Sequence, residues 1–157
     1  MDFEKRLMFT WSSPLAKELS ERDSERLAEV TRYRVLNDGE VLIQDGELDN
    51  SLYVVVSGAL SVEKLDDDGA VHQLYLIEEG KLAGELGFVD GNEHTATLRA
   101  KGQTEVLTLG REPFETLLDT NPQIVYYVMR AIVRSSHAIV RRMNIEHVKM
   151  EQALNGA

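Results

Sequence analysis

Short apolar runs alternate with turn-forming residues through the middle of the chain, from Thr31 to Leu109. The runs are rich in Val, Leu, Ile and Tyr, and Gly, Asn and Asp separate them. Several short strands at regular spacing, with turn signals between them, are typical of an antiparallel β-sandwich or barrel. We expect strands at residues 33–36, 41–44, 52–56, 60–65, 72–77, 95–100 and 105–109. Asp68-Gly69 predicts a hairpin turn between the fourth and fifth of these.

Helical patterns flank this β region on both sides. Residues 3–30 predict short helices packed on the β region, with Pro14 opening one and Ser20 capping another. Residues 111–119 predict a further short helix, and a long helix begins at Pro122. The sequence therefore predicts three parts, an N-terminal helical segment at 1–30, a β-roll at 31–110, and a short helix plus a long helix at 111–157.

The long helix is expected to continue at least to Met150, and it carries a stripe at alternating spacings of four and three. The stripe consists of Val125, Met129, Ile132, Ser136, Ile139, Met143, Glu146 and Met150. This heptad spacing is that of a coiled-coil seam, with Ser136 and Glu146 as polar interruptions. The helix is long for a small domain, and nothing after it covers the stripe. We therefore expect a homodimer through residues 122–150.

Composition narrows the class of protein. The chain has 157 residues and a net charge of −10, which disfavours electrostatic attraction to nucleic acid or anionic membranes. It contains no cysteine, which excludes disulfides and thiolate chemistry. The N-terminus lacks the features of a signal peptide, and no apolar run approaches the ~20 residues of a spanning helix. We expect a cytoplasmic protein without nucleic-acid or membrane partners.

Candidate chemistry concentrates in residues 80–100, where four glycines, Gly80, Gly84, Gly87 and Gly91, occur close together. Glycine lets the backbone approach a ligand closely, and N–H groups of such a loop can converge on an anion. Glu85 is an acceptor suited to sugar hydroxyls, and Thr95 offers a hydroxyl to a phosphate oxygen. The stretch therefore predicts a loop that binds a small anion.

Gly84-Glu85-Leu86-Gly87, followed by Thr95-Ala96-Thr97-Leu98-Arg99-Ala100, resembles the phosphate-binding cassette of cyclic nucleotide-binding domains, as in the cyclic-AMP receptor protein family of bacterial regulators. The turn glycines from Gly39 to Gly58 resemble the first half of the same roll, so the similarity covers roughly residues 15–145. The resemblance implies a mainly β fold with flanking helices, an antiparallel double-stranded β-helix (jelly-roll) followed by a dimerisation helix.

The resemblance also implies a site for cyclic AMP or cyclic GMP. Its residues are Gly84, Glu85, Leu86, Gly87, His94, Thr95 and Ala96. Glu85 corresponds to the family glutamate that binds the ribose 2′-hydroxyl. The backbone of Gly84 and Leu86, with Thr95, is expected to face the cyclic phosphate. No metal or other cofactor is expected.

Two positions depart from the family pattern. His94 stands where the family has an arginine that pairs with the phosphate. Arginine is a permanently charged planar donor, whereas imidazole is mostly neutral at pH 7. We therefore expect affinity to rise as the pH falls toward 6. Ile139 and Val140 stand where the receptor protein has hydroxyl residues that hydrogen-bond adenine, so apolar contacts replace those hydrogen bonds.

These features favour a regulatory ligand-sensing module that binds a cyclic nucleotide or similar small anion and signals through its long helix. The alternative is a structural or protein-interaction dimer module with a degenerate nucleotide pocket. An internal salt bridge that fills the pocket at Glu85 would favour this alternative. The basic cluster of Arg130, Arg134, Arg141 and Arg142 is expected to pair with acidic groups on the roll or across the dimer.

Two further function classes are disfavoured by what the chain contains. A metal-dependent enzyme on a cupin-like roll needs clustered histidines, but the four histidines, His72, His94, His137 and His147, include no His-x-His pair. A serine nucleophile elbow is also absent, so we do not expect an enzyme. The receptor-protein family carries a helix-turn-helix domain after the long helix, and this chain ends at Ala157, about where that domain begins. We therefore do not expect the chain to read DNA.

Overall fold

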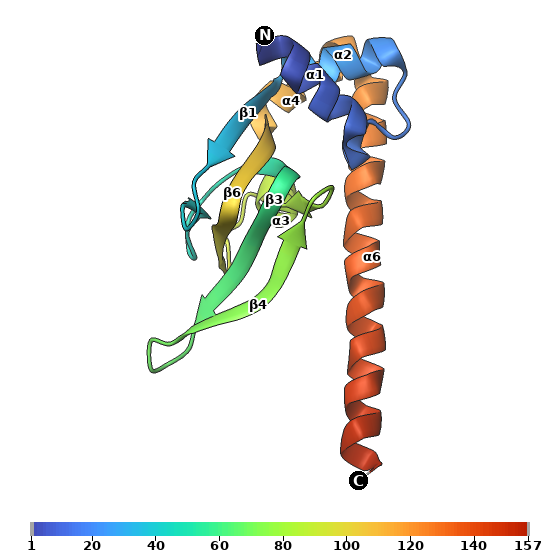
Figure 1. Ribbon diagram of the computed structural model, residues 1–157. Coiled ribbons are helices and arrows are strands. Elements are labelled where there is room, and N and C mark those ends of the chain that lie inside the picture. Colours follow the sequence, from blue (N-terminus) through green and yellow to red (C-terminus); the bar gives the residue numbers. More distant parts are fainter. Residues whose placement is uncertain (1, 157) are drawn as a thin grey trace.

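The computed structural model describes residues 2–156, in which N-terminal helices, a rolled β-sheet and a long helix follow one another. The N-terminal helices lie at one end of the roll, and the long helix α6 runs beside it and projects past it (Figure 1). The helices are α1 (Asp2–Ser12), the 3-10 helix η1 (Pro14–Ala16), α2 (Glu21–Glu29), α3 (Glu85–Asp90), α4 (Arg111–Glu115), α5 (Leu117–Thr120) and α6 (Pro122–Asn155).

The six strands form one antiparallel sheet in the order β1-β6-β3-β4, with β2 paired to β6 and β5 paired to β3. They are β1 (Thr31–Leu36), β2 (Val41–Ile43), β3 (Ser51–Leu65), β4 (Val71–Glu78), β5 (Leu82–Ala83) and β6 (Thr97–Gly110). The mainly β prediction, an antiparallel jelly-roll with flanking helices and a long C-terminal helix, is confirmed.

The predicted hairpin turn is also confirmed. Gly69 has a φ of +83°, and the carboxylate of Asp66 accepts hydrogen bonds from the backbone N–H groups of Asp68 and Ala70, each at 2.9 Å. Strands β3 and β4 pair directly on either side of this turn.

Two predicted strand breaks are wrong, because Gly58 and Gly102 lie inside the continuous strands β3 and β6. The pairing of these strands shifts register around Gly58, as at β-bulges. A Cβ on Gly58 would lie 2.6 Å from the carbonyl oxygen of Gln103, so only glycine fits where the two strands press together. These glycines bend strands, and they do not end them.

Three smaller predictions also need correction. Strand β6 begins at Thr97, whereas it was expected from residue 95. The single helix expected at 111–119 is divided into α4 and α5 at Thr116, whose hydroxyl donates to the carbonyl of Pro113. Residues 85–90, expected as a loop, form helix α3.

The core has two parts that share the sheet between them. One lies inside the roll and includes Ile43, Val55 and Val106. The other lies between the sheet and the helices, and there the first turns of α6 bury Ile124, Val128, Ala131 and Ile132. Beyond Ile132 no residue of α6 within the described chain is buried. The first part of α6 is therefore held by the core, and its remainder projects.

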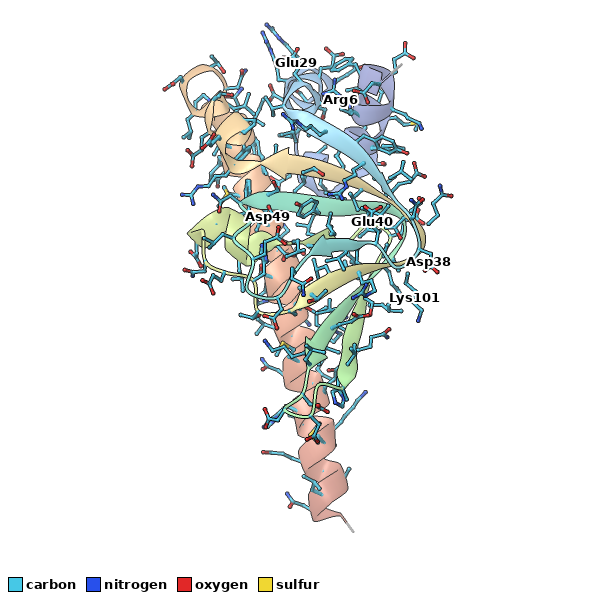
Figure 2. The ribbon with its side chains drawn as sticks, turned by 90° about the vertical axis from the view of Figure 1, so that its left-hand side faces the viewer. Arg6, Glu29, Asp38, Glu40, Asp49 and Lys101 are labelled. Atoms are coloured by element: carbon cyan, nitrogen blue, oxygen red, sulfur yellow. The ribbon has the colours of Figure 1, made fainter. Side chains whose placement is uncertain are left out.

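The N-terminal helices are joined to the sheet through Arg6. Its guanidinium donates to the carbonyl oxygens of Ala28, at 3.0 Å, and Thr31, at 2.7 Å, at the junction of α2 and β1. Figure 2 labels Arg6 at this end of the molecule, together with Glu29 at the end of α2. The predicted cap of α2 is confirmed, because the hydroxyl of Ser20 accepts a hydrogen bond from the N–H of Asp23. Among the described helices, none has both the length and the apolar character that crossing a bilayer requires.

Candidate functional site

A cavity of about 800 Å³ lies between the roll and α6. This volume is within the range of about 300–1,000 Å³ that is typical of small-molecule sites. Its walls come from β4, from the segment that leads from β5 into α3, from the segment before β6, and from α6. The cavity brings together six of the predicted site residues, which are Gly84, Glu85, Leu86, His94, Thr95 and Ala96.

Gly87 does not line the cavity, and its place in the fold is a steric one. It is buried, and a Cβ at this position would lie 2.5 Å from the carbonyl oxygen of Asp49 and 2.8 Å from the imidazole of His94. Such contacts are shorter than van der Waals packing allows. Gly87 thus lets the His94 ring and the loop before β3 pack directly on α3.

The N-terminus of α3 faces this cavity through a glycine turn. Gly84, its N-cap, has a φ of +80°, and a Cβ there would lie 2.8 Å from the carbonyl oxygen of Ser51. Glycine is therefore required for the chain to turn from β5 into the helix. The first backbone N–H groups of a helix have no backbone partner within it, so Leu86 brings such a donor to the cavity edge.

Glu85 places a carboxylate oxygen without a hydrogen-bond partner in this cavity. The residue is half-buried, and its buried Oε1 has no hydrogen-bond partner within residues 2–156. Burial raises the pKa of the Glu85 carboxyl, an effect that a hydrogen bond from its own backbone partly offsets. A buried polar group without a partner costs free energy unless a ligand satisfies it. No internal salt bridge of the described residues fills the pocket at Glu85.

His94 is held by the loop that precedes β3. Its Nε2 lies 3.0 Å from the carbonyl oxygen of Asp49, and a carbonyl only accepts, so Nε2 carries a proton and donates it. The Asp49 side chain fixes the same loop by accepting from the N–H of Ser51, at 2.7 Å, and from the hydroxyl of Tyr53, at 2.6 Å. Nδ1 is therefore the imidazole nitrogen left for a ligand.

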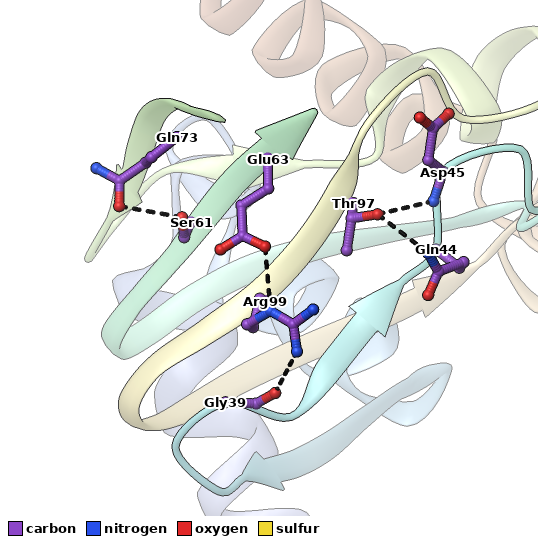
Figure 3. A network of polar contacts seen from close by, with 8 residues as sticks. All are labelled: Gly39, Gln44, Asp45, Ser61, Glu63, Gln73, Thr97 and Arg99. Atoms are coloured by element: carbon purple, nitrogen blue, oxygen red, sulfur yellow. Dashed lines mark hydrogen bonds and ion pairs between the residues drawn. The ribbon is translucent and has the colours of Figure 1, made fainter. Parts of the chain in front are cut away.

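Arg99, the arginine nearest in sequence to His94, has a structural role. Its Nε donates to Glu63 Oε1 at 3.1 Å and its Nη1 to the carbonyl oxygen of Gly39 at 2.9 Å (Figure 3). Next to it, the Thr97 hydroxyl accepts from the N–H of Asp45 at 3.1 Å. These bonds hold β2, β3 and β6 together. Arg99 is not among the residues that line the cavity.

The remaining wall contains residues that the sequence did not single out as ligand contacts. Tyr75 on β4 lines the cavity, as do Ser135 and Arg142 on α6. Ile139, one of the two helix positions compared with the receptor family, also lines it, whereas Val140 points away and is 51% exposed. No local pattern reveals these contacts, because packing of α6 beside β4 creates them.

Members of the basic cluster on α6 make two different kinds of contact. Arg130 and Arg134 both pair with Glu18, with 3.5 Å between Arg130 Nε and the Glu18 carboxylate. Glu18 lies between η1 and α2, so the acidic partner comes from the N-terminal segment, whereas the roll or a second chain was expected. Arg142 lies over the ring of Tyr75, with its guanidinium carbon 5.9 Å from the ring centroid.

The other histidines make ordinary surface contacts. His72 Nε2 lies 2.6 Å from Asp66 in the β3–β4 hairpin, and His147 Nε2 lies 3.2 Å from Glu151 one turn along α6. Throughout residues 2–156, no three or more His, Asp or Glu side chains are grouped so that they could hold a metal ion.

The chain is similar in sequence to a known domain family and to regulatory proteins. The cyclic nucleotide-binding domain family matches residues 33–121. A cAMP-dependent protein kinase regulatory subunit from Blastocladiella emersonii is 30% identical over 105 residues, 67% of this chain and 26% of that protein. The cAMP-activated global transcriptional regulator CRP from Salmonella typhimurium is 33% identical over 110 residues, 69% of this chain and 49% of that protein. The chain thus spans at most about half the length of these relatives.

Solved structures agree on the fold. A cyclic nucleotide-binding domain from Methylobacillus flagellatus superimposes with a TM-score of 0.81 at 19% identity, covering 94% of this chain and 83% of that one. The family match spans more than half of the chain and contains the strands and α3 that form the roll side of the cavity. The chain therefore belongs to the cyclic nucleotide-binding domain family.

Proposed function

We propose that this chain is a regulatory sensor whose cavity binds cyclic AMP, cyclic GMP or a similar small anion. The observation that carries the proposal is the buried, unpartnered Oε1 of half-buried Glu85 in a cavity of about 800 Å³. A carboxylate accepts hydrogen bonds only, and the ribose 2′-hydroxyl is a donor of the required kind. Family membership and the cAMP-related names of two relatives support the same ligand class.

The other predicted site residues have distinct roles in this proposal. The N–H groups at the start of α3, next to Gly84 and including that of Leu86, face the cyclic phosphate together with Thr95. His94 supplies a charge through Nδ1 when it is protonated, because Nε2 is occupied by Asp49. Ala96 forms part of the wall, and Gly87 permits the close packing of α3 that holds the site together.

The signal passes through α6, because that helix forms one wall of the cavity. The core holds its first turns, while the part that contributes Ile139 and Arg142 to the wall lies beyond the buried residues. A ligand that contacts both the roll and this part of α6 favours one position of the helix over others. Differential contact of this kind is what a ligand needs to shift a conformational equilibrium.

The projecting part of α6 is the surface that we propose for a homodimer. Val125, Met129 and Ile132, the first members of the predicted stripe, pack in the core of the monomer. Five of the exposed apolar residues of α6 lie on a neighbouring stripe at steps of three, four and seven, which we call the α6 seam. It consists of Val133, Val140, Met143, Met150 and Leu154. This is heptad spacing, so the seam suits a second copy of α6.

In this proposal the chain binds its ligand and does not catalyse a reaction. Both named relatives are regulators. The net charge of −10 disfavours electrostatic attraction to nucleic acid or to an anionic membrane. We place the protein in the cytoplasm in this proposal. A structural dimer module with a degenerate pocket is the second candidate, and the observation that favours it is His94 in the place of the family arginine.

Isothermal titration of the purified protein with cyclic AMP and cyclic GMP, at pH 6 and pH 7.5, separates the two candidates. A sensor binds at least one of them with micromolar or tighter affinity, and 5′-AMP and 5′-GMP, which lack the cyclic phosphate, bind more weakly. Absence of binding by either cyclic nucleotide at both pH values would contradict the sensor and support the degenerate pocket.

A further inference from the structure

Tyr75 and Arg142 meet where β4 faces α6 across the cavity, and we call this part of the cavity wall the base slot. Tyr75 lies on β4 and Arg142 lies on α6, yet the guanidinium of Arg142 is 5.9 Å from the centroid of the Tyr75 ring. Both residues line the cavity that contains Glu85. None of the ion pairs within residues 2–156 involves Arg142, in contrast to Arg134, which pairs with Glu18. The guanidinium is therefore free to donate to a ligand.

The chemistry of this slot suits a planar heterocycle. Aromatic rings and guanidinium planes are the two side-chain surfaces on which nucleobases stack. In the proposed function, the backbone N–H groups of α3 bind the phosphate and the carboxylate of Glu85 binds the ribose. Burial raises the pKa of the Tyr75 phenol. The negative charge of Glu85 raises this pKa further, and the positive charge of Arg142 lowers it. Tyr75, Arg142 and Glu85 all line one cavity, so the base slot and the proposed ribose site share that cavity.

We infer that Tyr75 and Arg142 bind the nucleobase and that they select guanine over adenine. The inference rests on the proposed function and specifies its ligand. Guanine presents two acceptors, O6 and N7, on the edge that arginine reads in bidentate fashion. Adenine presents the N7 acceptor beside an N6 amino donor, which opposes a guanidinium. Arg142 thus discriminates between the two bases, and Tyr75 supplies the stacking surface.

Neighbouring groups on the cavity wall agree with a base rich in acceptors. Gln73 on β4 uses its Oε1 to accept from the Ser61 hydroxyl at 3.1 Å, which leaves the amide NH₂ as its free group (Figure 3). Ile139 on α6 offers neither donor nor acceptor. The wall therefore presents donors from Arg142 and Gln73, which match O6 of guanine better than the amino group of adenine.

The test is isothermal titration of the wild-type chain with cyclic GMP, cyclic IMP and cyclic AMP. Cyclic IMP keeps O6 and N7 and lacks the 2-amino group of guanine, so it isolates the edge that Arg142 is inferred to read. We expect cyclic GMP and cyclic IMP to bind with similar affinity, and cyclic AMP to bind about 5- to 150-fold more weakly, the range for one bidentate arginine–base pair.

Variants assign the selectivity to the slot. Arg142→Leu should lower the affinities for cyclic GMP and cyclic IMP to near that for cyclic AMP. Arg141→Leu removes the same charge from a neighbouring position that does not line the cavity, and it should leave the selectivity unchanged. Tyr75→Leu should lower the affinity for all three nucleotides, whereas Tyr75→Phe should retain binding because the stacking ring remains.

The outcomes distinguish this inference from the proposed function. Tight binding without a preference for cyclic GMP and cyclic IMP overturns the inference and leaves the sensor intact. If Arg142→Leu lowers the affinities for all three nucleotides by the same factor, the inference is also overturned. Such a result would mean that the guanidinium binds the phosphate that the three ligands share. Absence of binding by all three nucleotides to the wild-type chain contradicts the proposed function itself, and the inference with it.

Discussion

Nε2 of His94 lies 3.0 Å from the carbonyl oxygen of Asp49, so the imidazole donates to the loop before β3 and leaves only Nδ1 for a ligand in the cavity that His94 lines. Protonation adds an N–H at Nδ1 and a positive charge close to the place where the family has arginine. A charge-assisted hydrogen bond is roughly twice as strong as a neutral one.

We therefore expect affinity for the preferred cyclic nucleotide to rise between pH 7.5 and pH 6, by roughly three- to tenfold for one such bond. His94→Gln keeps an N–H for the Asp49 carbonyl and cannot become charged, so it should lose this rise. Burial raises the pKa of Glu85, so this carboxylate becomes protonated as the pH falls and is then a weaker hydrogen-bond acceptor for the ligand. The wild-type chain and His94→Gln share this effect on affinity. Titration calorimetry of the pair isolates His94, and an equal pH dependence in both would contradict its role.

Glu85 is expected to reduce the stability of the free protein. Burial raises its pKa in the folded chain, so the folded state binds the proton more tightly than the unfolded state does. The destabilisation is complete above the folded-state pKa and disappears as the pH falls below the ordinary carboxyl range. Glu85→Gln should therefore raise the melting temperature at pH 7.5, by about 2–4 °C for a gain of about 1 kcal/mol, and should bind nucleotide more weakly.

The matched control for this variant is Glu79→Gln, which removes the same charge from an exposed position before α3. It should change neither the melting temperature nor the affinity appreciably. Thermal unfolding of the three proteins at pH 7.5 and pH 4 checks the sign. A lower melting temperature for Glu85→Gln at pH 7.5 would show that the carboxylate stabilises the free fold, contrary to this account.

The α6 seam gives a prediction about assembly. Val140 and Val148 are almost equally exposed, at 51% and 52%, but only Val140 lies on the seam. Val140→Glu should shift the chain from dimer to monomer, because a charge in a coiled-coil seam loses its solvation. Val148→Glu, on another face of α6, should leave the dimer intact. Sedimentation equilibrium measures both, and a monomeric wild-type chain at high micromolar concentration would contradict the proposed dimer.

Local signals were enough to predict most of the strands and helices, and the resemblance to cyclic nucleotide-binding domains supplied the jelly-roll arrangement. Turn glycines such as Gly69, the alternation of apolar runs and Pro122 at the start of α6 each act within a few residues. Gly58 and Gly102 misled the prediction because positive φ serves both turns and bulges. Only the partner strand decides between these uses, as the approach of Gly58 to Gln103 shows.

The cassette side of the candidate site was also predictable, since Gly84 to Leu86 and His94 to Ala96 line one cavity. The opposite wall was not, because Tyr75 and Arg142 meet only through the packing of α6 beside β4. The residues of the α6 seam could not be predicted from the sequence for a similar reason, because tertiary packing decides which side of α6 is buried. Heptad spacing does not tell which apolar stripe a monomer buries, and here Ile132 packs in the core while Val133 is exposed.

The most direct test of the central claim compares a cyclic nucleotide with its 2′-deoxy analogue, using wild-type chain and Glu85→Gln. We expect the wild-type chain to bind the 2′-deoxy analogue roughly 10- to 150-fold more weakly, which corresponds to the loss of one hydrogen bond to a charged group. We also expect Glu85→Gln to lose most of this discrimination. Full discrimination in Glu85→Gln, or no difference between the ligands in the wild-type chain, would contradict the assignment of Glu85 to the ribose.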